Sequence, residues 1–564
     1  MLGPNFTGQI IDEIEAGNGR QISDLALKMV AAGIGITTLS AIRRVVAGTI
    51  SLGLEKQLRD SLFRHLLHMI CRFFDRMQTG QLISRMTVDV TQVRFFLGYG
   101  LLYFFMHVVT LIAVPVALFR LSPTLALAIC MMLPLLVIAS TRYSRLSHEV
   151  LKEVQQREAL LTAAAEENIV GARVVRAFGQ ENAETSRFRT LVDDYLLKER
   201  EQLLIGARYQ PLYALIPGVA LAVVVLLAGP VIDSGALTLG EFFQFYLLAL
   251  MLTGPLRSIG FLLSRAQRAT ASGERLWELL DTDEQLPSPA VLTPEPKRDP
   301  RGSAVHFDAV TFSYQDGRVV IDDVTLTIEP GTTVALLGAT GSGKSTLASL
   351  VPRFYDPDGG RVVVDGVDVR DRDVQALRRT VGIVDQEPFL FSATVAENMR
   401  FGVPDISDGD IWQALEAAQA AGFVKDLPDG IDTVVGERGL TLSGGQRQRL
   451  SIARALVTDP RILILDDATA SVDSRVESDI ASALDSATHG RTTIVIAHRP
   501  STIALADRIV VLERGRIIDD GTHEELLARS ELYQQVHEQK AARREFLLDE
   551  PSGSVFGDPS EDGA

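Results

Sequence analysis

Long uncharged runs occupy the first half of the chain, whereas the second half alternates short apolar runs with polar stretches. Five runs are long enough for membrane-spanning helices, which need about 20 largely apolar residues. They are residues 29–54, 95–119, 121–141, 209–232 and 242–264. The middle three contain no Asp, Glu, Lys or Arg, while Arg43 and Arg44 interrupt the first run and Arg257 the last. This repetition favours membrane helices over the alternative of helices buried in a soluble core.

Basic residues set the predicted orientation of these helices. Connection 55–94 holds seven Lys and Arg and connection 142–208 holds eleven, whereas the turn at Arg120 holds one and turn 233–241 none. The positive-inside rule therefore places the two long connections in the cytosol. Both carry apolar residues at three- and four-residue spacing, so we expect the membrane helices to continue into the cytosol as paired rods.

Five spans with a cytosolic second half place Met1 outside the membrane. The opening LGPNFTGQIIDEI is typical of the outer end of a helix. We therefore expect a first span that is largely missing, through truncation or through a true start upstream. Arg43 and Arg44 leave two interpretations open: a charged lining of an inward-facing cavity, or side chains that extend to the cytosolic head groups.

Length, composition and charge predict the domain boundaries and argue against one class of binding partner. A chain of 564 residues is too long for one core. We predict a membrane domain over 1–281, a proline-rich linker over 282–303, a second domain over 304–540 and an acidic disordered tail over 541–564. A net charge of −16 argues against a nucleic-acid partner, because phosphate binding needs clustered basic residues. Only two cysteines occur, which excludes a disulfide framework.

In the second domain, continuous apolar strands alternate with helical stretches, which indicates a mainly parallel sheet. The strands include AVHFDAVTFSY, TVALLGA, VGIVDQ, ILILDD and TTIVIAH. TVALL leads directly into GATGSGKST, whose spacing fits the phosphate-binding P-loop. Its candidate ATP-binding residues are Gly338, Thr340, Gly341, Ser342, Gly343, Lys344, Ser345 and Thr346.

These residue types have specific expected tasks at a nucleotide. Glycines let the loop turn tightly, so that its N–H groups can point at phosphate oxygens. Lys344 is expected to contact the β- and γ-phosphates, and Ser345 to bind Mg²⁺. Asp466 ends the strand ILILD at the carboxyl edge of the sheet, where it is expected to hold the same Mg²⁺. A nucleoside-triphosphatase follows from this arrangement.

The stretch LSGGQRQRLSIARAL, residues 442–456, is the signature of ATP-binding-cassette (ABC) proteins and lies just before the Asp466 strand. From this motif, the second domain resembles the nucleotide-binding domain of ABC transporters, and the first domain resembles the permease fused to it in ABC exporters. The implied fold is a membrane all-α domain with long cytosolic helix extensions, plus an α/β P-loop nucleotide-binding domain.

The resemblance also assigns roles to residues outside the P-loop. It implies that Tyr314 stacks on adenine, that Gln386 contacts Mg²⁺ and that His498 is the switch histidine of the hydrolytic site. Residues 433–439 resemble a loop that contacts the cytosolic helix ends, and residues 471–473 a dimer-contact loop.

The family mechanism requires a second chain. Two cassettes close head to tail over two ATP molecules, so that the signature residues of one chain act on the ATP of its partner. Here those residues are Ser443, Gly444, Gly445 and Gln446. The resemblance therefore implies a second half-transporter chain as partner, with ATP and Mg²⁺ as cofactors.

The implied activity is ATP hydrolysis that drives export of an amphiphilic or other small substrate, which the sequence does not identify. The implied location is the bacterial plasma membrane, with several spans in contact with lipid and the nucleotide-binding domain in the cytoplasm. An importer with the same fold, or a membrane-anchored regulatory ATPase, is the alternative.

Asp467 departs from the family pattern, in which the next residue after the magnesium aspartate is usually a glutamate that polarises the attacking water. The aspartate side chain is one methylene shorter, so its carboxylate lies farther back than that of a glutamate. A misplacement of about 1 Å can cost on the order of a hundredfold in rate. We therefore predict that Asp467, with Gln386 and His498, forms an impaired catalytic set, and that the chain pairs in a heterodimer rather than a homodimer. In the alternative, local backbone shifts let Asp467 act normally.

Overall fold

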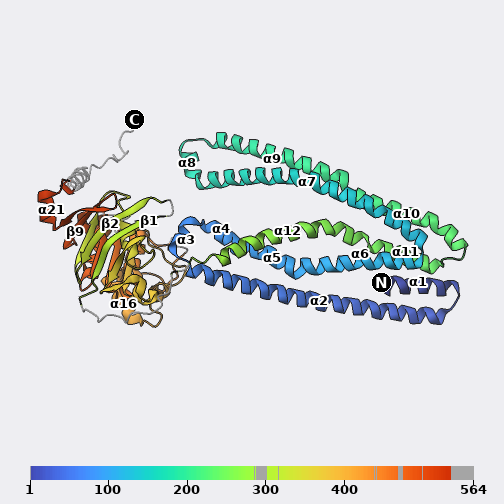
Figure 1. Ribbon diagram of the computed structural model, residues 1–564, viewed down its shortest axis with the longest axis horizontal. Coiled ribbons are helices and arrows are strands. Elements are labelled where there is room, and N and C mark those ends of the chain that lie inside the picture. Colours follow the sequence, from blue (N-terminus) through green and yellow to red (C-terminus); the bar gives the residue numbers. More distant parts are fainter. Residues whose placement is uncertain are drawn as a thin grey trace, which may run out of the picture. The chain divides into compact units, whose positions relative to one another are not determined.

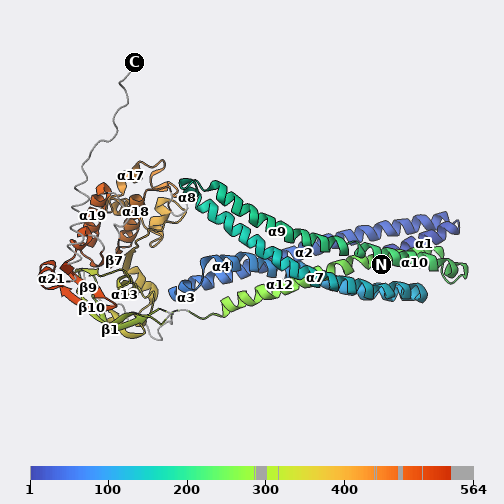
Figure 2. The ribbon, with the colours of Figure 1, turned by 90° about the horizontal axis from the view of Figure 1, so that it is seen from above.

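A computed structural model describes residues 2–284, 286, 301–314, 317–436, 439, 441–467, 474–497, 500–531 and 533–534. The chain divides into two compact units (Figure 1, Figure 2). The first unit consists of Met1–His68 and Gln78–Asp283, and the second of Met69–Met77 and Glu284–Ala564. Most of the predicted linker and all of the predicted acidic tail lie outside the described residues.

The described part of the first unit consists of helices. They are α1 (Leu2–Glu15), α2 (Gly19–His68), α4 (Thr79–Ser84), α5 (Val90–Phe95), α6 (Leu101–Leu121), α7 (Pro123–Val170), α8 (Ala172–Ala177), α9 (Glu181–Tyr209), α10 (Leu212–Asp233), α11 (Leu239–Met251) and α12 (Thr253–Asp281). Two π-helical turns, Arg85–Asp89 and Phe96–Gly100, join α4, α5 and α6 into one path. Helix α7 begins with Pro123, whose fixed φ suits a first turn, and Thr238 and Glu241 form the capping box that starts α11.

Five helical paths in the described chain are long and apolar enough to cross a membrane, and each contains one of the five predicted runs, apart from Leu121 and Ser122 at the start of the third run. The prediction of five spans is therefore confirmed. Helix α2 has 50 residues and extends about 75 Å at about 1.5 Å per residue, far beyond the about 30 Å of hydrocarbon in a bilayer. The predicted rods are also confirmed, and Figure 1 shows α7 and α9 side by side. The side chain of Arg257 lies outside the described part of the unit.

The helices of the first unit are joined by an apolar core and by one buried carboxylate. Leu118 of α6, Val224 of α10 and Phe245 of α11 are each fully buried in the same cluster. Farther along the unit, the Asp89 carboxylate accepts hydrogen bonds from the Ser272 hydroxyl at 2.8 Å and from Arg275 Nε at 3.0 Å. These contacts tie the first π-helical turn to α12.

The second unit contains two sheets. Strands β10 (Arg516–Gly521), β9 (Arg508–Glu513), β3 (Thr333–Leu337), β8 (Thr492–Ile496), β7 (Ile462–Asp466) and β6 (Val381–Val384) form a six-stranded sheet in that order. Strands β2 (Val319–Ile328), β1 (Val305–Ser313), β4 (Gly359–Val364) and β5 (Val367–Asp368) form a four-stranded antiparallel sheet.

Helices make up much of the rest of the second unit in the part of the chain that the structure describes. They are α3 (Cys71–Arg76), α13 (Lys344–Leu350), α14 (Val374–Arg379), α15 (Val395–Arg400), α16 (Asp408–Ala417), α17 (Ala421–Lys425), α18 (Gly444–Val457), α19 (Ser474–Thr488), α20 (Pro500–Ile503) and α21 (His523–Arg529). One core lies between the two sheets and includes Leu347 of α13, while the other includes Leu450 of α18 and Ile480 of α19. Figure 2 shows α17, α18 and α19 gathered on one side of the sheet.

The mainly parallel sheet predicted from the sequence is confirmed, because β9, β3, β8, β7 and β6 run parallel and only β10 is antiparallel. AVHFDAVTFSY is the exception. It forms β1, which pairs antiparallel with β2 and β4 in the other sheet. Its apolar residues are buried in the core that includes α13, which also buries residues of the parallel sheet. The strand is therefore as apolar as a strand of the parallel sheet.

Candidate functional site

The P-loop joins β3 to α13 through a turn that demands glycine at two points. Gly338 has a φ of +152°, and a Cβ atom there would lie 2.2 Å from the carbonyl oxygen of Leu512. Gly343 has a φ of +103°, and its Cβ would lie 2.8 Å from the carbonyl oxygen of Val320. Any other residue at these positions would push the loop away from the strands beneath it, so the backbone path depends on both glycines.

Lys344, the first residue of α13, folds back over this loop. Its Nζ donates to the carbonyl oxygens of Gly338 and Ala339, at 2.9 Å each. Burial lowers the pKa of the Lys344 amine, while the nearby carboxylates of Asp466 and Asp467 act in the opposite direction. The P-loop lysine and both aspartates therefore belong to one electrostatic cluster.

The other candidate residues of the P-loop differ in accessibility. Thr340, Gly341 and Ser345 are exposed, whereas Ser342 and Thr346 are buried. The Thr346 hydroxyl lies 3.1 Å from the hydroxyl of Tyr314, which joins the loop helix to the residue expected to stack on adenine. The exposed Ser345 hydroxyl is free to meet a ligand above the loop.

Four neighbouring parallel strands bring the remaining site residues to one edge. Leu336 of β3 and Asp466 of β7 both pair with Ile496 of β8, and Val384 of β6 pairs with Leu465 of β7. The segments that follow these strands therefore leave the sheet side by side. The carboxyl edge of parallel strands is where ligands bind in open α/β sheets.

The two aspartates after β7 have different environments. Asp466 is half-buried at the end of the strand. Asp467 is only 8% exposed and has a φ of +40°, a left-handed conformation that is uncommon for a residue with a side chain. Its N–H donates to the Ile496 carbonyl oxygen at 3.2 Å, and its Oδ1 is buried without a hydrogen-bond partner among the described residues. A buried, unsatisfied carboxylate oxygen is available for a ligand.

Gln386 follows β6 and is exposed. A few residues on, the Asn398 side chain fixes the loop: its Oδ1 accepts from the Phe391 N–H at 2.9 Å, and its Nδ2 donates to the Phe391 carbonyl oxygen at 3.1 Å. Thr394 and Glu397 form the capping box that starts α15. Gln386 thus lies near the start of a loop whose other end is held by the Asn398 hydrogen bonds and the capping box of α15.

The signature sequence forms the start of α18. Ser443 is the N-cap, and its Oγ accepts from the Gln446 N–H at 3.3 Å. Gln446 Oε1 in turn accepts from the Ser443 N–H at 2.8 Å, which completes a capping box. Ser443 is exposed, Gly444 and Gln446 are half-buried and Gly445 is buried. The 14-residue helix therefore presents its N-terminus, with one serine hydroxyl, to the surroundings.

An aromatic cluster beside the P-loop was not predicted from the sequence. The Tyr355 ring meets the rings of Tyr314 and Phe312 at centroid distances of 5.6 and 5.4 Å. Tyr355 also donates from its hydroxyl to Asp75 Oδ2 at 2.8 Å, and Arg72 Nη2 donates to the Ser313 carbonyl oxygen at 3.3 Å. The segment Met69–Met77 is therefore bound to the same aromatic cluster as the expected adenine-stacking tyrosine.

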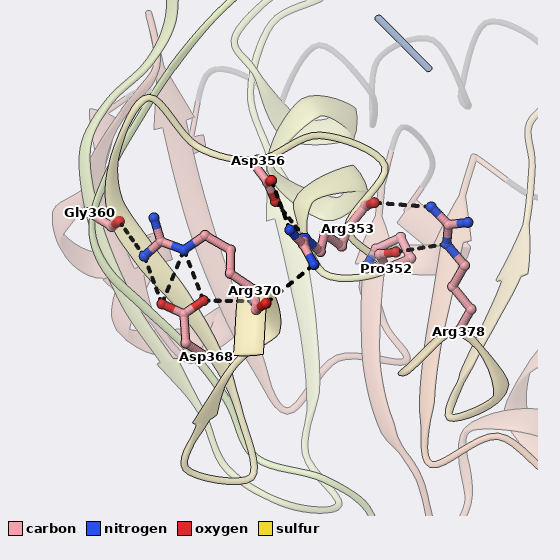
Figure 3. A network of polar contacts seen from close by, with 7 residues as sticks. All are labelled: Pro352, Arg353, Asp356, Gly360, Asp368, Arg370 and Arg378. Carbon is pink, nitrogen blue, oxygen red and sulfur yellow. Dashed lines mark hydrogen bonds and ion pairs between the residues drawn. The ribbon is translucent and has the colours of Figure 1, made fainter. Parts of the chain in front are cut away.

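Arg353 holds the loop that carries Tyr355, and Figure 3 shows the contact of this arginine with Asp356. It is 1% exposed and has a φ of +53°. Its Nε and Nη2 donate to the two carboxylate oxygens of Asp356 at 2.7 and 3.1 Å. Arg378 donates to the carbonyl oxygens of Pro352 and Arg353 at 3.2 and 3.1 Å. This network fixes the backbone on both sides of Tyr355.

Several predicted site residues lie outside the described residues. They are His498, all of 471–473, and Glu437 and Arg438 within 433–439. For His498 the structure gives only the preceding strand β8, which ends at Ile496 on the site edge of the sheet.

The ABC transporter transmembrane region family matches residues 1–256, and the ABC transporter family matches residues 321–470. The ATP-dependent lipid A-core flippase of Thiobacillus denitrificans is 39% identical over 86% of this chain and 83% of its own length. A multidrug efflux ATP-binding/permease protein of Mycobacterium tuberculosis is 36% identical over 95% of this chain and 44% of its own length. The solved structure of a bacterial Atm1-family ABC exporter with ATP bound has a TM-score of 0.75 and 29% identity, covering 95% of each chain.

The matches span both units. The chain is a multi-pass integral membrane protein with a cytoplasmic ATPase domain, and it couples ATP hydrolysis to export. ABC exporters work as dimers. The chain belongs to the ABC transporter family, as an exporter half-transporter whose membrane region and ATPase domain share one polypeptide.

Proposed function

We propose that this chain is one half of a heterodimeric exporter, and that its own ATP site binds the nucleotide but hydrolyses it slowly. Asp467 is the observation that carries this proposal. It stands where the family usually has a glutamate, and its side chain is one methylene shorter. The P-loop and the preceding aspartate keep the expected residue types, so the substitution affects hydrolysis more than binding.

The surroundings of Asp467 leave it little freedom to compensate for its length. Its carboxylate is set back by roughly 1.5 Å, one C–C bond. The backbone is in a left-handed turn and its N–H is bonded to the Ile496 carbonyl oxygen. A backbone shift that restored the reach would strain that bond. Because a misplacement of about 1 Å can cost on the order of a hundredfold, slow hydrolysis follows.

The remaining residues support nucleotide binding. Tyr314 would stack on adenine and Lys344 would neutralise the β- and γ-phosphates. Ser345, Asp466 and Gln386 offer only oxygen donors toward a metal, which fits Mg²⁺, a cation that prefers oxygen ligands. When bound, Mg²⁺ would neutralise charge on the β- and γ-phosphates. Asp467 and His498 would act on the attacking water and the terminal phosphate.

The signature residues would serve the partner's site. Ser443 is exposed at the N-terminus of the long helix α18, where the helix dipole favours an anion. Gly444 and Gly445 leave room for close approach of a phosphate to the backbone. These features support a role for Ser443 and Gln446 at a γ-phosphate that the partner's P-loop holds.

The exported compound is proposed to be an amphiphilic or other small molecule. The relatives named as a lipid A-core flippase and as a multidrug efflux protein support this class. The long apolar paths of the first unit support the same class, since they offer an amphiphile a surface for its apolar part.

ATP turnover in the purified complex with its partner chain tests the proposal. Asp467→Asn should lower turnover less than about threefold, because the site is already slow, whereas amidation of the partner's equivalent glutamate should nearly abolish it. Ser443→Ala should slow the partner's site by about tenfold through loss of a phosphate contact. A near-total loss of turnover from Asp467→Asn would indicate a catalytic carboxylate and a symmetric pair instead.

A further inference from the structure

Arg43 lies in α2 within the apolar run 29–54, and its own helix offers no acidic residue nearby. The nearest ones in α2 are Asp24 and Glu55, about 28 Å and about 18 Å away at about 1.5 Å of rise per residue. Helix α6, which Arg43 contacts, contains neither Asp nor Glu. The guanidinium group therefore has no fixed anion on either helix.

The contacts of this guanidinium are uncharged. Its Nη1 lies 3.0 Å from Met106 Sδ, and its Cζ lies 5.7 Å from the centre of the Tyr103 ring. Its Nε is buried and has no hydrogen-bond partner among the described residues. A thioether sulfur is only a weak acceptor, and an aromatic face does not neutralise a full charge, so neither contact replaces a counter-ion.

Some arginines in the described part of this unit do have ion pairs. Arg59 and Arg94 both contact the Glu55 carboxylate, at 2.7 and 3.0 Å. Arg275 is paired with Asp89. Arg43 lies well inside an apolar run and has no ion pair within the described residues.

The direction of the side chain argues against extension to the cytosolic head groups. The side chain is instead directed at α6, as its contact with Met106 shows. An ionisable residue that faces protein inside a membrane span and lacks a partner indicates a ligand site.

We infer that Arg43, between Tyr103 and Met106 of α6, binds the anionic head group of an amphiphilic ligand. The inference rests on the proposed export of an amphiphile and specifies the charge of its head group. A phosphate or carboxylate would supply the missing counter-ion, while the apolar tail would remain against the uncharged surfaces of α2 and α6. A zwitterionic or cationic head group would leave the guanidinium without net neutralisation.

Equilibrium binding of radiolabelled dodecyl phosphate tests the inference without ATP. The full complex is placed in phosphatidylcholine nanodiscs, and empty nanodiscs supply the background. Arg43→Met should weaken binding at least about tenfold and Arg43→Lys should retain most of it, because a single charge–charge contact in an apolar setting is worth about a factor of ten or more. Arg44→Met is the matched control: Arg44 is the exposed neighbour, and its loss should change affinity less than about twofold.

A second variant protects the test against misfolding of Arg43→Met. Met106→Glu places a carboxylate against Arg43, so it should keep the helices together while it competes with the ligand, again with at least about tenfold weaker binding. Unchanged affinity in both Arg43→Met and Met106→Glu would overturn the inference, as would equal losses in Arg43→Met and Arg44→Met. Displacement by an equal concentration of inorganic phosphate would overturn the amphiphile as ligand.

A further measurement separates transported cargo from resident lipid. Stimulation of ATP turnover by dodecyl phosphate, lost in Arg43→Met, supports a cargo site, whereas binding without stimulation supports a lipid site at the same residue. Failure of the proposed heterodimer would alter turnover or co-purification but leave this binding assay unaffected, so the two failures are distinguishable.

Discussion

Asp467 combines a shortened side chain with a backbone conformation that few side-chain-bearing residues adopt. If the missing methylene limits hydrolysis, then restoring it should raise the rate. Asp467→Glu is therefore expected to increase ATP turnover at this chain's site by about tenfold to a hundredfold. Turnover is measured in the complex whose partner carries an inactivated glutamate, so that only this site contributes.

The matched control for that experiment is Asp467→Asn in the same background. It should leave the residual rate low and ATP affinity unchanged, because binding rests on the P-loop. An unchanged or lower rate in Asp467→Glu would mean that side-chain length does not limit the reaction.

Tyr355 links the Tyr314 ring to Asp75 through one hydrogen bond of 2.8 Å. Burial and the neighbouring Asp75 carboxylate raise the pKa of the Tyr355 hydroxyl, so it remains a donor across the physiological range. Tyr355→Phe keeps the ring contacts and removes the bond, which should cost about 1 kcal/mol. The expected result is a melting temperature of the ATPase unit about 2–4 °C lower in the purified complex.

A double substitution shows whether that cost belongs to the pair. Asp75→Asn should lower the melting temperature similarly, and Tyr355→Phe combined with Asp75→Asn should add little to either single change. Fully additive shifts would show that the two side chains contribute independently.

Local motifs made part of the site predictable. The sequence led to Lys344, Ser345 and Asp466 because glycine spacing and a strand before each motif are local signals. Tyr355 and Asp75 were missed because they are far apart in the chain and their contact is made only by tertiary packing. The positive φ of Asp467 was also beyond prediction, since nothing in the letters ILILDD encodes a left-handed residue.

At the scale of elements, the segment between α13 and β4 depends on a buried arginine. Arg353→Met removes both bonds to Asp356 and leaves that carboxylate partly able to rehydrate. We expect a loss of about 2 kcal/mol, seen as a melting temperature of the ATPase unit lower by about 4–8 °C. ATP affinity should also fall, because the segment positions Tyr355 against Tyr314.

Arg361→Met is the control for this change. Arg361 also pairs with an aspartate, Asp308, but its side chain is 59% exposed. An exposed pair contributes about 1 kcal/mol or less, so the melting temperature should move by less than about 4 °C. Equal shifts in the two variants would show that burial of Arg353 is not what stabilises the segment.

Helices and strands followed from periodicity, but their pairing did not. The five apolar runs and the strand before the P-loop lie where the sequence placed them. β1 has the same apolar character as the parallel strands, yet it pairs antiparallel in a second sheet. Hydrophobic pattern reports burial, and both sheets bury residues in one core, so the pattern could not assign β1 to its sheet.

At the scale of the whole molecule, one chain supplies one P-loop and one signature sequence, with five spans among the residues that the structure describes. The proposed head-to-tail assembly of two ATP sites would need two of each motif, so it would need a second half. If Asp467 makes its own site slow, the two sites of the assembly differ in the nucleotide they hold during steady turnover. This asymmetry would distinguish the assembly from one in which both sites hydrolyse ATP equally.

Photolabelling during steady ATP turnover tests for this asymmetry between the two sites. The complex is labelled in parallel with 8-azido-ATP carrying radiolabel at the α- or γ-phosphate, and the two chains are then separated. Retained γ-label reports unhydrolysed ATP. We expect a γ-to-α ratio close to one on this chain and a ratio several-fold lower on its partner. An equally low ratio on both chains would contradict this expectation.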